Sequence, residues 1–380
     1  MPYIIYLIRI WVRVRAPVHP AAVRAAEAPG VCASHGPRAD GGRRETDRDS
    51  FIDRGQPVLT AQDFKGVYGI LATPAKVGAD RWDATDTVDL DETARLTEQL
   101  IQDGCSGLLA LGTTGECATL TEAEFEVFVD CFVSTVDKRV PALVGATTLG
   151  THDTVRRMRF LRDCGADGTM LGLPMWQPCS ETQAVKFYAS LSEAFPDLAI
   201  MVYANQNAFR FSFPPSFWGA VAELAPTVTS AKFASPVGYL DCLAAANEKI
   251  NFLPIDMMAL MFAQQAPDAM TASWATAACM GPQPCVALMD AIETRDLDRA
   301  AEITNDIAWA NETFIPGGDF EVFSQYNLQL EKIRFNEAGY CQAGPIRPPY
   351  NDVPEEYAAG ARECGQRWAQ LVKKYSSAPS

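Results

Sequence analysis

Eight short apolar segments, each followed by a segment with helical periodicity, constrain the fold of this chain more than any other feature. The alternation starts near Leu59, and each unit is about 20 to 35 residues long. Strands that alternate with amphipathic helices indicate a parallel sheet, and eight such units are typical of a (β/α)8 TIM barrel. A doubly wound sheet is the alternative, but no Gly-x-Gly-x-x-Gly follows the first strand. We therefore predict an α/β fold, a TIM barrel.

The pattern also predicts where each element lies. The expected strands are residues 67–72, 107–111, 142–146, 168–171, 199–203, 228–232, 251–254 and 270–273. The expected helices are residues 89–103, 121–136, 151–164, 181–194, 215–224, 239–246, 257–263 and 282–294. Three more helical patterns, including 320–337 and 354–374, follow without strands between them. We expect them to form a C-terminal helical appendage on the barrel.

Residues 1–58 differ in composition from the rest of the chain. They contain nine arginines and six acidic residues, whereas the remainder has a formal charge of −18. Arg9 interrupts the apolar start, which is therefore too short to span a membrane, and a signal-peptide pattern is lacking. We expect a disordered or spurious extension at 1–58, with targeting as the alternative, a barrel at 59–295 and packed helices at 296–380.

The charge and the rarer residues exclude several classes of function. A net charge of −15 argues against nucleic acid or an anionic membrane as partner, because both require a basic surface. The 11 cysteines include no Cys-x-x-Cys pair, which indicates reduced thiols and a cytoplasmic location. With only His19, His35 and His152, neither a multi-histidine metal site nor a Ser-His-Asp triad is expected.

A single lysine, Lys232, ends the predicted sixth strand. A lysine in such a β-branched strand either reaches solvent at the strand's exit or serves as a nucleophile, because an apolar interior favours the neutral amine. In a TIM barrel the chemistry lies at the carboxyl ends of the strands, where the loops meet. The residues expected there are Gly112-Thr113-Thr114-Gly115, Trp176, Tyr203, Asn205, Lys232 and Trp274.

Two of these features have a structural and a chemical interpretation. Residues 112–115, here called the threonine turn, offer hydroxyl and N–H groups that suit a small carboxylate. They also suit a plain connection in which Thr119 or Thr121 caps the next helix. Tyr203 is either a core residue or a proton shuttle beside Lys232.

Together the residues describe a lysine that forms an imine with a 2-keto acid whose carboxylate lies in the threonine turn. A protonated imine is an electron sink, so a bond two carbons away can break or form without a metal or cofactor. The scarcity of histidine fits such a site.

Gly112-Thr-Thr-Gly-Glu116, Tyr203 and Lys232, at their spacing, resemble the pyruvate-dependent class I aldolases of the dihydrodipicolinate synthase and N-acetylneuraminate lyase superfamily. The resemblance covers roughly residues 59–376. The departures from the two enzymes are Met175-Trp176 in place of a tyrosine pair, Ala208 near the place of a substrate-binding arginine, and Ser230-Ala231 instead of Gly-Ile before the lysine. These departures argue against a role in lysine biosynthesis.

Further segments match a narrower group. They are Gly168 to Trp176, Tyr203-Ala-Asn205, Ala272-Ser-Trp274, Gly318-Asp-Phe320, Phe323-Ser-Gln-Tyr-Asn327 and Gly344 to Asn351. These segments resemble the hydratase-aldolases of bacterial polycyclic-aromatic degradation, which act on trans-o-hydroxybenzylidenepyruvate or trans-2'-carboxybenzalpyruvate.

That resemblance implies a reaction and its residues. Lys232 would form a Schiff base with the ketone of an aryl-substituted 2-oxobut-3-enoate, and Tyr203 would take the proton from the new benzylic hydroxyl. Asn205 and Asn327 would hold the water that adds, with Ser324 near by. The products would be an aromatic aldehyde and pyruvate.

The same resemblance implies the binding groups. Thr113 and Thr114 would hold the pyruvyl carboxylate, and Trp274 would pack against the substrate. It implies no metal or cofactor, and it implies the superfamily's usual homotetramer. Without the resemblance, Ser324 and Asn327 would be interpreted as an ordinary helix surface.

The aryl group is the least determined part of the substrate. The apolar residues near the strand ends suit an aryl ring, although several fit equally well as core: Met175, Trp176, Phe209, Phe211, Met257, Met258 and Trp274. Arg210 is the only basic residue in the loop after the fifth strand, and we expect it to favour a ring that bears a carboxylate. Arg347 lies in a proline-rich segment that fits a tail wrapping the barrel or a peptide-binding motif.

Two other functions stay open. One is pyruvate aldol chemistry on an aliphatic or sugar-like partner, as in dihydrodipicolinate synthase or a sugar-acid lyase. The other is a catalytically inactive ligand-binding barrel, which the lack of a covalent adduct between Lys232 and pyruvate would indicate.

Overall fold

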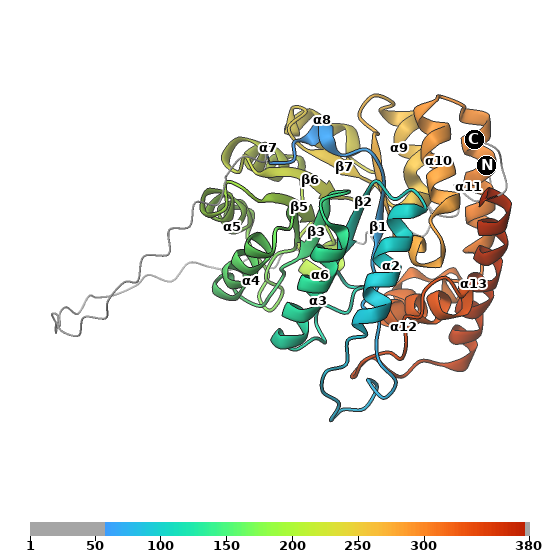
Figure 1. Cartoon of the computed structure of the whole chain (residues 1–380). Coiled ribbons are helices and arrows are strands. Elements are labelled where there is room, and N and C mark those ends of the chain that lie inside the picture. Colours follow the sequence, from blue (N-terminus) through green and yellow to red (C-terminus); the bar gives the residue numbers. More distant parts are fainter. Residues whose placement is uncertain (1–57, 377–380) are drawn as a thin grey trace, which may run out of the picture. The chain divides into compact units, whose positions relative to one another are not determined.

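The computed structural model describes residues 58–376, which form one unit with its own core (Figure 1). The N-terminal extension expected at 1–58 lies outside the described residues except for Val58.

Eight parallel strands form a nearly closed barrel, which confirms the predicted TIM-barrel fold. They pair in the order β7-β6-β5-β4-β3-β2-β1-β8. Between β7 and β8, Ile255 pairs with Trp274, and the backbone N–H of Trp274 donates to the Pro254 carbonyl at 2.9 Å. The strands are β1 (Gly66–Ile70), β2 (Gly107–Ala110), β3 (Ala142–Gly145), β4 (Gly168–Leu171), β5 (Ala199–Tyr203), β6 (Val228–Lys232), β7 (Asn251–Leu253) and β8 (Ala272–Ala275).

Helices cover the outer face of the strands, as Figure 1 shows. The α-helices of the barrel are α2 (Leu90–Gln102), α3 (Glu122–Val136), α4 (Thr151–Cys164), α5 (Glu181–Ala194), α6 (Gln206–Phe209), α7 (Pro215–Leu224), α8 (Tyr239–Ala246), α9 (Ala259–Gln265) and α10 (Gln283–Glu293). Short 3-10 helices are η1 (Ala61–Asp63), η2 (Asp256–Met258), η3 (Ala277–Met280) and η4 (Pro316–Gly318). Most bounds agree with the predicted periodicity to within two residues.

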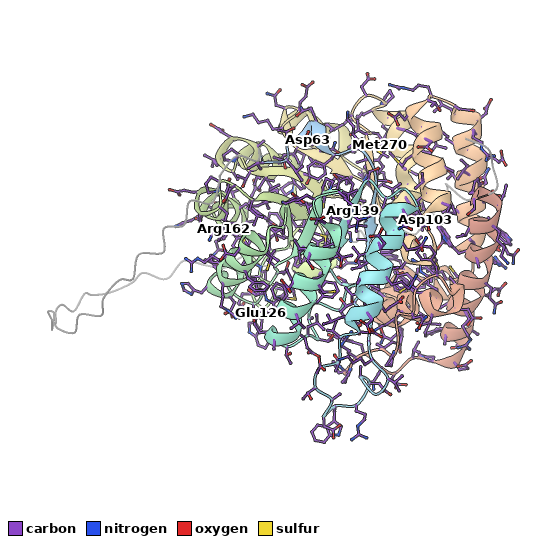
Figure 2. All side chains as sticks on the ribbon, viewed as in Figure 1. Asp63, Asp103, Glu126, Arg139, Arg162 and Met270 are labelled. Carbon is purple, nitrogen blue, oxygen red and sulfur yellow. The ribbon has the colours of Figure 1, made fainter. Side chains whose placement is uncertain are left out.

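Helix α3 illustrates why these segments fold as they do. Thr121 caps its N-terminus and exchanges hydrogen bonds with Glu124, which satisfies N–H groups that a helix start leaves unpaired. Phe125 and Phe128 on its inner face are buried. Charged side chains such as Glu126 project from the outer helical surface (Figure 2).

The position predicted for the last strand was wrong by two residues. Strand β8 pairs with β1 so that Ala272 lies beside Gly66, and Trp274 therefore lies inside the strand. Thr271, expected inside the strand, belongs to the amino-terminal end of the barrel. There its hydroxyl donates to the Phe64 carbonyl and accepts from the Asn251 amide.

Three C-terminal helices follow the barrel, as the pattern predicted: α11 (Leu297–Ala310), α12 (Phe320–Ala338) and α13 (Glu355–Ser376). A small second core between them contains Phe314, Phe323, Leu330, Ala361 and Cys364. Helix α12 reaches back to the barrel, because Lys332 bonds to the loop after β2 and Arg334 to Thr276 after β8. This helix therefore lies at the end of the barrel where the candidate site is.

Three negative findings apply to residues 58–376. No helix there has the length and apolarity needed to cross a bilayer. The ten cysteines in this range form no disulfide. No group of three or more His, Cys, Asp or Glu side chains there is arranged to hold a metal ion.

Candidate active site

Lys232 and Tyr203 lie side by side at the carboxyl ends of β6 and β5. The two residues are register partners in the parallel pair. The Lys232 Nζ atom lies 4.2 Å from the centre of the Tyr203 ring and 3.8 Å from the centre of the Trp274 ring. Lys232 is only 7% exposed, so it is not a lysine that reaches solvent at a strand exit. The two aromatic faces therefore fix the position of a buried amine.

The Tyr203 hydroxyl is surrounded by groups that favour its deprotonated form. It lies 3.0 Å from the Thr113 hydroxyl and accepts a hydrogen bond from the Asn205 amide at 3.4 Å. Burial alone would raise the pKa of Tyr203, but the positive charge of Lys232 and these hydrogen bonds outweigh it, so the pKa lies below its usual value. A lowered pKa makes loss of the phenol proton easier, and the resulting phenolate can accept a proton from a substrate hydroxyl.

The threonine turn lies against the same tyrosine. Thr113 and Thr114 are half-buried, while Gly115 is buried. A Cβ atom at Gly115 would lie 2.8 Å from the Leu111 nitrogen, so the backbone can fold this tightly only with glycine. The turn thus brings Thr113 into contact with Tyr203.

Asn205 connects the end of β5 to the one-turn helix α6. Its side-chain oxygen accepts from the Ala208 N–H at 3.0 Å as the N-cap, which leaves the amide nitrogen facing Tyr203. The cap therefore fixes the side chain beside the Tyr203 hydroxyl.

Trp274 closes the other side of the Lys232 amine. Its indole N–H is buried and has no hydrogen-bond partner in the described part of the chain, and the residue is 8% exposed. Because an unpaired buried donor is costly, this N–H is available to an acceptor on a ligand.

Trp176 and Arg210 lie at the rim. Trp176 is exposed in the loop after β4, and the Arg210 Nη2 atom donates to its carbonyl at 2.7 Å and to the carbonyl of Met175. Among residues 58–376, the Nε and Nη1 atoms of Arg210 have no hydrogen-bond partner. Arg210 therefore holds two loops together while part of its guanidinium stays available.

Ser324 and Asn327 lie in the first half of α12, outside the barrel. Ser324 is exposed and its hydroxyl donates to the Glu321 carbonyl, while Asn327 is half-buried. Within residues 58–376, neither makes a hydrogen bond to Lys232 or Tyr203. The structure therefore brings together the barrel residues of the predicted set more closely than the two on α12.

The apolar candidates divide into rim and core. Met257 is half-buried beyond β7, whereas Phe211 packs against Phe213 and Phe217 in the layer under α7. Phe209 packs against the Tyr203 ring, with ring centres 5.3 Å apart. Several of these residues are therefore core, as the alternative interpretation expected.

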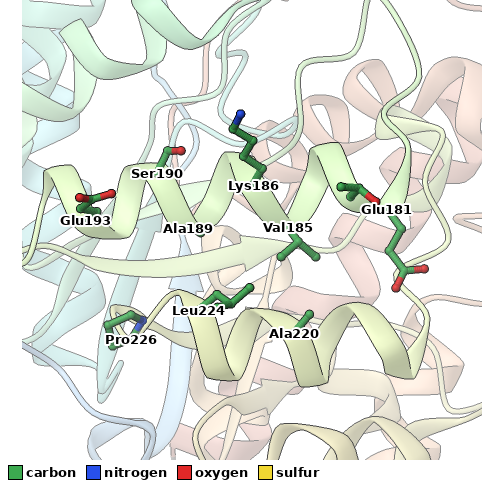
Figure 3. Close-up of a pocket in the computed structure, with 10 residues that line it drawn as sticks. Glu181, Val185, Lys186, Ala189, Ser190, Glu193, Ala220, Leu224 and Pro226 are labelled. Atoms are coloured by element: carbon green, nitrogen blue, oxygen red, sulfur yellow. The ribbon is translucent and has the colours of Figure 1, made fainter.

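An open groove lies elsewhere, between α5 and α7 on the outside of the barrel (Figure 3). Its lining includes Val185, Lys186, Ala220 and Leu224 and none of the candidate site residues. The groove and the aldolase-like site are therefore separate features.

The sequence analysis missed a buried ion cluster behind the threonine turn. A Glu116 carboxylate oxygen accepts from Lys332 Nζ at 2.5 Å and from Arg347 Nη1 at 2.6 Å, and all three side chains are at most 2% exposed. Burial lowers the pKa of Lys332 to about 8, although Glu116 opposes this effect. Glu116 and Arg347 stand in motifs noted above, but nothing in the sequence pairs them with Lys332.

Comparison with known proteins identifies the group to which this site belongs. Residues 63–358 match the profile of the dihydrodipicolinate synthetase family. The chain is 44% identical, over 84% of its length and 97% of the relative, to the trans-O-hydroxybenzylidenepyruvate hydratase-aldolase of Pseudomonas putida. It is 39% identical, over the same shares, to the trans-2'-carboxybenzalpyruvate hydratase-aldolase of Nocardioides sp. strain KP7.

A solved structure agrees with these relatives. The structure described as PhdJ bound to substrate intermediate superposes with a TM-score of 0.82 at 38% sequence identity. The superposition covers 83% of this chain and 99% of that one.

Proposed function

The chain belongs to the dihydrodipicolinate synthetase family, and from this premise we propose that it is a Schiff-base hydratase-aldolase that cleaves an aryl-substituted benzylidenepyruvate. The products are an aromatic aldehyde and pyruvate, and the process served is the degradation of polycyclic aromatic hydrocarbons. The observation that carries the proposal is the buried Lys232 amine between the rings of Tyr203 and Trp274.

The reaction begins at Lys232. After it gives up its proton, the amine attacks the C2 ketone of the substrate, and loss of water gives a protonated imine conjugated with the C3–C4 double bond. The threonine turn holds the adjoining carboxylate through Thr113 and Thr114. The imine withdraws electrons, so C4, the benzylic carbon, becomes electrophilic.

Hydration follows at C4. Water adds there, and C3 takes a proton, which gives the imine of a 4-hydroxy acid. Asn205 orients the water from the barrel side, and Asn327 and Ser324 on α12 complete the water site. The position of α12 at the carboxyl ends of the strands supports this assignment.

Cleavage reverses an aldol addition. Tyr203 takes the proton from the C4 hydroxyl, the C3–C4 bond breaks, and its electron pair moves into the imine to form an enamine. The aldehyde leaves, C3 is protonated, and water releases pyruvate from Lys232. The lowered pKa of Tyr203 supports its role as the base.

The rim sets the aryl specificity. Trp176 and Trp274 contact the ring, and Arg210 favours a ring that bears an ortho carboxylate over one that bears a hydroxyl. The two groups of relatives differ in this substituent by name. We further propose a cytoplasmic homotetramer that requires no metal or cofactor.

The test is a substrate panel with purified protein. We expect pyruvate and aldehyde release from trans-o-hydroxybenzylidenepyruvate and trans-2'-carboxybenzalpyruvate, measured by the loss of conjugated absorbance and by chromatography. Lys232→Ala should abolish release. Activity on aspartate semialdehyde or sialic acid, without activity on either aryl substrate, would instead favour an aliphatic or sugar-acid aldolase.

A further inference from the structure

The threonine turn has no lysine or arginine close behind it in the sequence, where the first one is Lys138. The fold supplies two from the far end of the chain. Lys332 comes from α12 and Arg347 from the connection between α12 and α13, and both bond to Glu116, the residue after the turn.

The cluster carries one positive charge in excess. Glu116 is a single carboxylate shared by two cations, and its other oxygen accepts the Arg347 backbone N–H at 2.9 Å. The remaining partners of Lys332 and Arg347 are neutral, namely backbone carbonyls and the Thr87 hydroxyl.

One more acid lies near the cluster. Thr87 connects Arg347 to Glu124 through its hydroxyl. Glu124 also accepts the Thr121 N–H at the start of α3, where its charge is compensated by the positive end of the helix. The helix end is equivalent to about half a unit charge, so Glu124 reduces the excess charge of the cluster without cancelling it.

Hydrogen bonds connect the cluster to the turn. The Glu116 N–H donates to the Thr113 carbonyl at 3.0 Å, and the Gly115 carbonyl accepts from the Thr73 hydroxyl at 2.7 Å. Arg347 Nη1 in turn donates to the Thr73 carbonyl at 3.2 Å. Because Glu116 follows Thr114 by two residues, their Cα atoms lie within about 7 Å of each other.

We propose that Glu116, Lys332 and Arg347 form a positively charged positioning cluster that makes the threonine turn selective for ligands with a carboxylate. The inference rests on the proposed function, because it assumes that a pyruvyl carboxylate occupies the turn. The cations act from behind the turn and do not touch the substrate. Their charge attracts the anion, and their hydrogen bonds hold the turn in shape.

The expected size of the effect follows from Coulomb's law. A unit charge about 8 Å from a carboxylate, at an effective dielectric constant of about 30, changes binding about tenfold. A neutral ligand of the same shape would gain nothing from this charge. A matched pair of ligands, one anionic and one neutral, therefore separates the charge from the structural role.

The experiment measures Schiff-base formation with pyruvate and with pyruvamide, its neutral analogue. Wild-type protein, Lys332→Met and Gln329→Met are incubated with each ligand at pH 7 and reduced with borohydride, and the ligand concentration for half-maximal adduct is read by intact mass. Gln329 is the matched control, because its amide ties α12 to the Asp352 carbonyl without charge.

Lys332→Met should raise the half-saturating concentration of pyruvate about tenfold and change that of pyruvamide less than about threefold. Gln329→Met should leave the ratio of the half-saturating concentrations of pyruvate and pyruvamide unchanged. Equal weakening of both ligands in Lys332→Met would overturn the proposal and leave the cluster as a structural element only.

Glu116→Gln provides a second variant in case Lys332→Met does not fold. It raises the net charge of the cluster by one with little change in shape, so pyruvate should bind tighter relative to pyruvamide. The inference would be contradicted if the affinity for pyruvate relative to pyruvamide stayed the same or fell in Glu116→Gln. Lack of any pyruvate adduct in the wild-type protein would instead remove the proposed function itself.

Discussion

Lys232 is the residue whose surroundings decide the chemistry. A lysine side chain usually keeps its ammonium in water, yet this one ends between two aromatic rings inside the barrel. The strand pattern identified the lysine, and the register of β5 with β6 explains why Tyr203 lies beside it. The charge of Lys232 and the Thr113 hydroxyl then lower the pKa of that tyrosine against the effect of burial.

Thr113→Val should move the pH dependence of cleavage. In the proposed mechanism the base in cleavage is the deprotonated Tyr203, so kcat should rise with pH through the pKa of this group. Removing the Thr113 hydroxyl removes a hydrogen bond that lowers this pKa, so the pKa rises and the limb of the kcat profile moves to higher pH. Steady-state aldehyde release at saturating substrate measures the limb, and a shift to lower pH would contradict the assignment.

Tyr203→Phe is the companion variant. It should lower kcat for cleavage by about 100-fold or more, because it removes the base, while the pyruvate adduct at Lys232 still forms.

Arg210→Ala should reduce discrimination between the two aryl substrates. The free nitrogens of the guanidinium can pair with an ortho carboxylate but gain less from a hydroxyl, so the preference for the carboxylated substrate should fall about tenfold. The ratio of kcat/KM for the two substrates measures this. Arg162→Ala, on the outer surface of α4, is the control, and an unchanged ratio in Arg210→Ala would rule out the role (Figure 2).

At the scale of the elements, the N-terminus of α3 is a connection between the barrel and its appendage. Glu124 accepts hydrogen bonds from Thr87 and Thr121, and Thr87 continues to Arg347. Burial opposes the charge of Glu124, but these hydrogen bonds outweigh it and lower its pKa to about 2.

Glu124→Gln should therefore lose stability in a pH-dependent way. The pKa is lower in the folded state than its usual 4.5, so the contribution of Glu124 is complete above about 4.5 and is lost as the pH falls toward 2. We expect the variant to be about 2 kcal/mol less stable at pH 7, with the difference narrowing below pH 4.5. Denaturant unfolding at several pH values measures it, with Glu126→Gln, exposed on the same helix, as the control. A difference that is constant from pH 7 to 3 would contradict this account.

The elements also show where sequence reasoning succeeds. Strands β4, β5 and β6 were predicted to the residue because each is a short apolar run between clear helical patterns. Strand β8 was misplaced because its start depends on pairing with β1, which no local pattern encodes.

Sequence reasoning likewise predicted some residues of the site and missed others. Residues at the strand ends were found because barrel topology alone brings them together. The cluster of Glu116, Lys332 and Arg347 was not predicted. Glu116 is more than 200 residues away from the other two in the sequence, and the three meet only through the packing of α12.

At the scale of the whole molecule, we predict a homotetramer. Large apolar side chains stay exposed on loops at the carboxyl-terminal rim, among them Val77, Trp82 and Leu149. Exposed apolar side chains of this size favour burial against other copies of the chain. Native mass spectrometry of the full chain should give a mass of four copies, and a monomer at micromolar concentration would contradict the prediction.

The intact mass of the full chain after incubation with pyruvate and borohydride shows whether Lys232 forms a Schiff base. Reduction converts a Schiff base into a stable secondary amine, so the wild-type protein should gain the mass of one reduced pyruvyl group per chain. Lys232→Ala should gain none, and peptide mapping should place the adduct on Lys232. A folded wild-type protein that gains no mass would contradict the aldolase account and favour an inactive ligand-binding barrel.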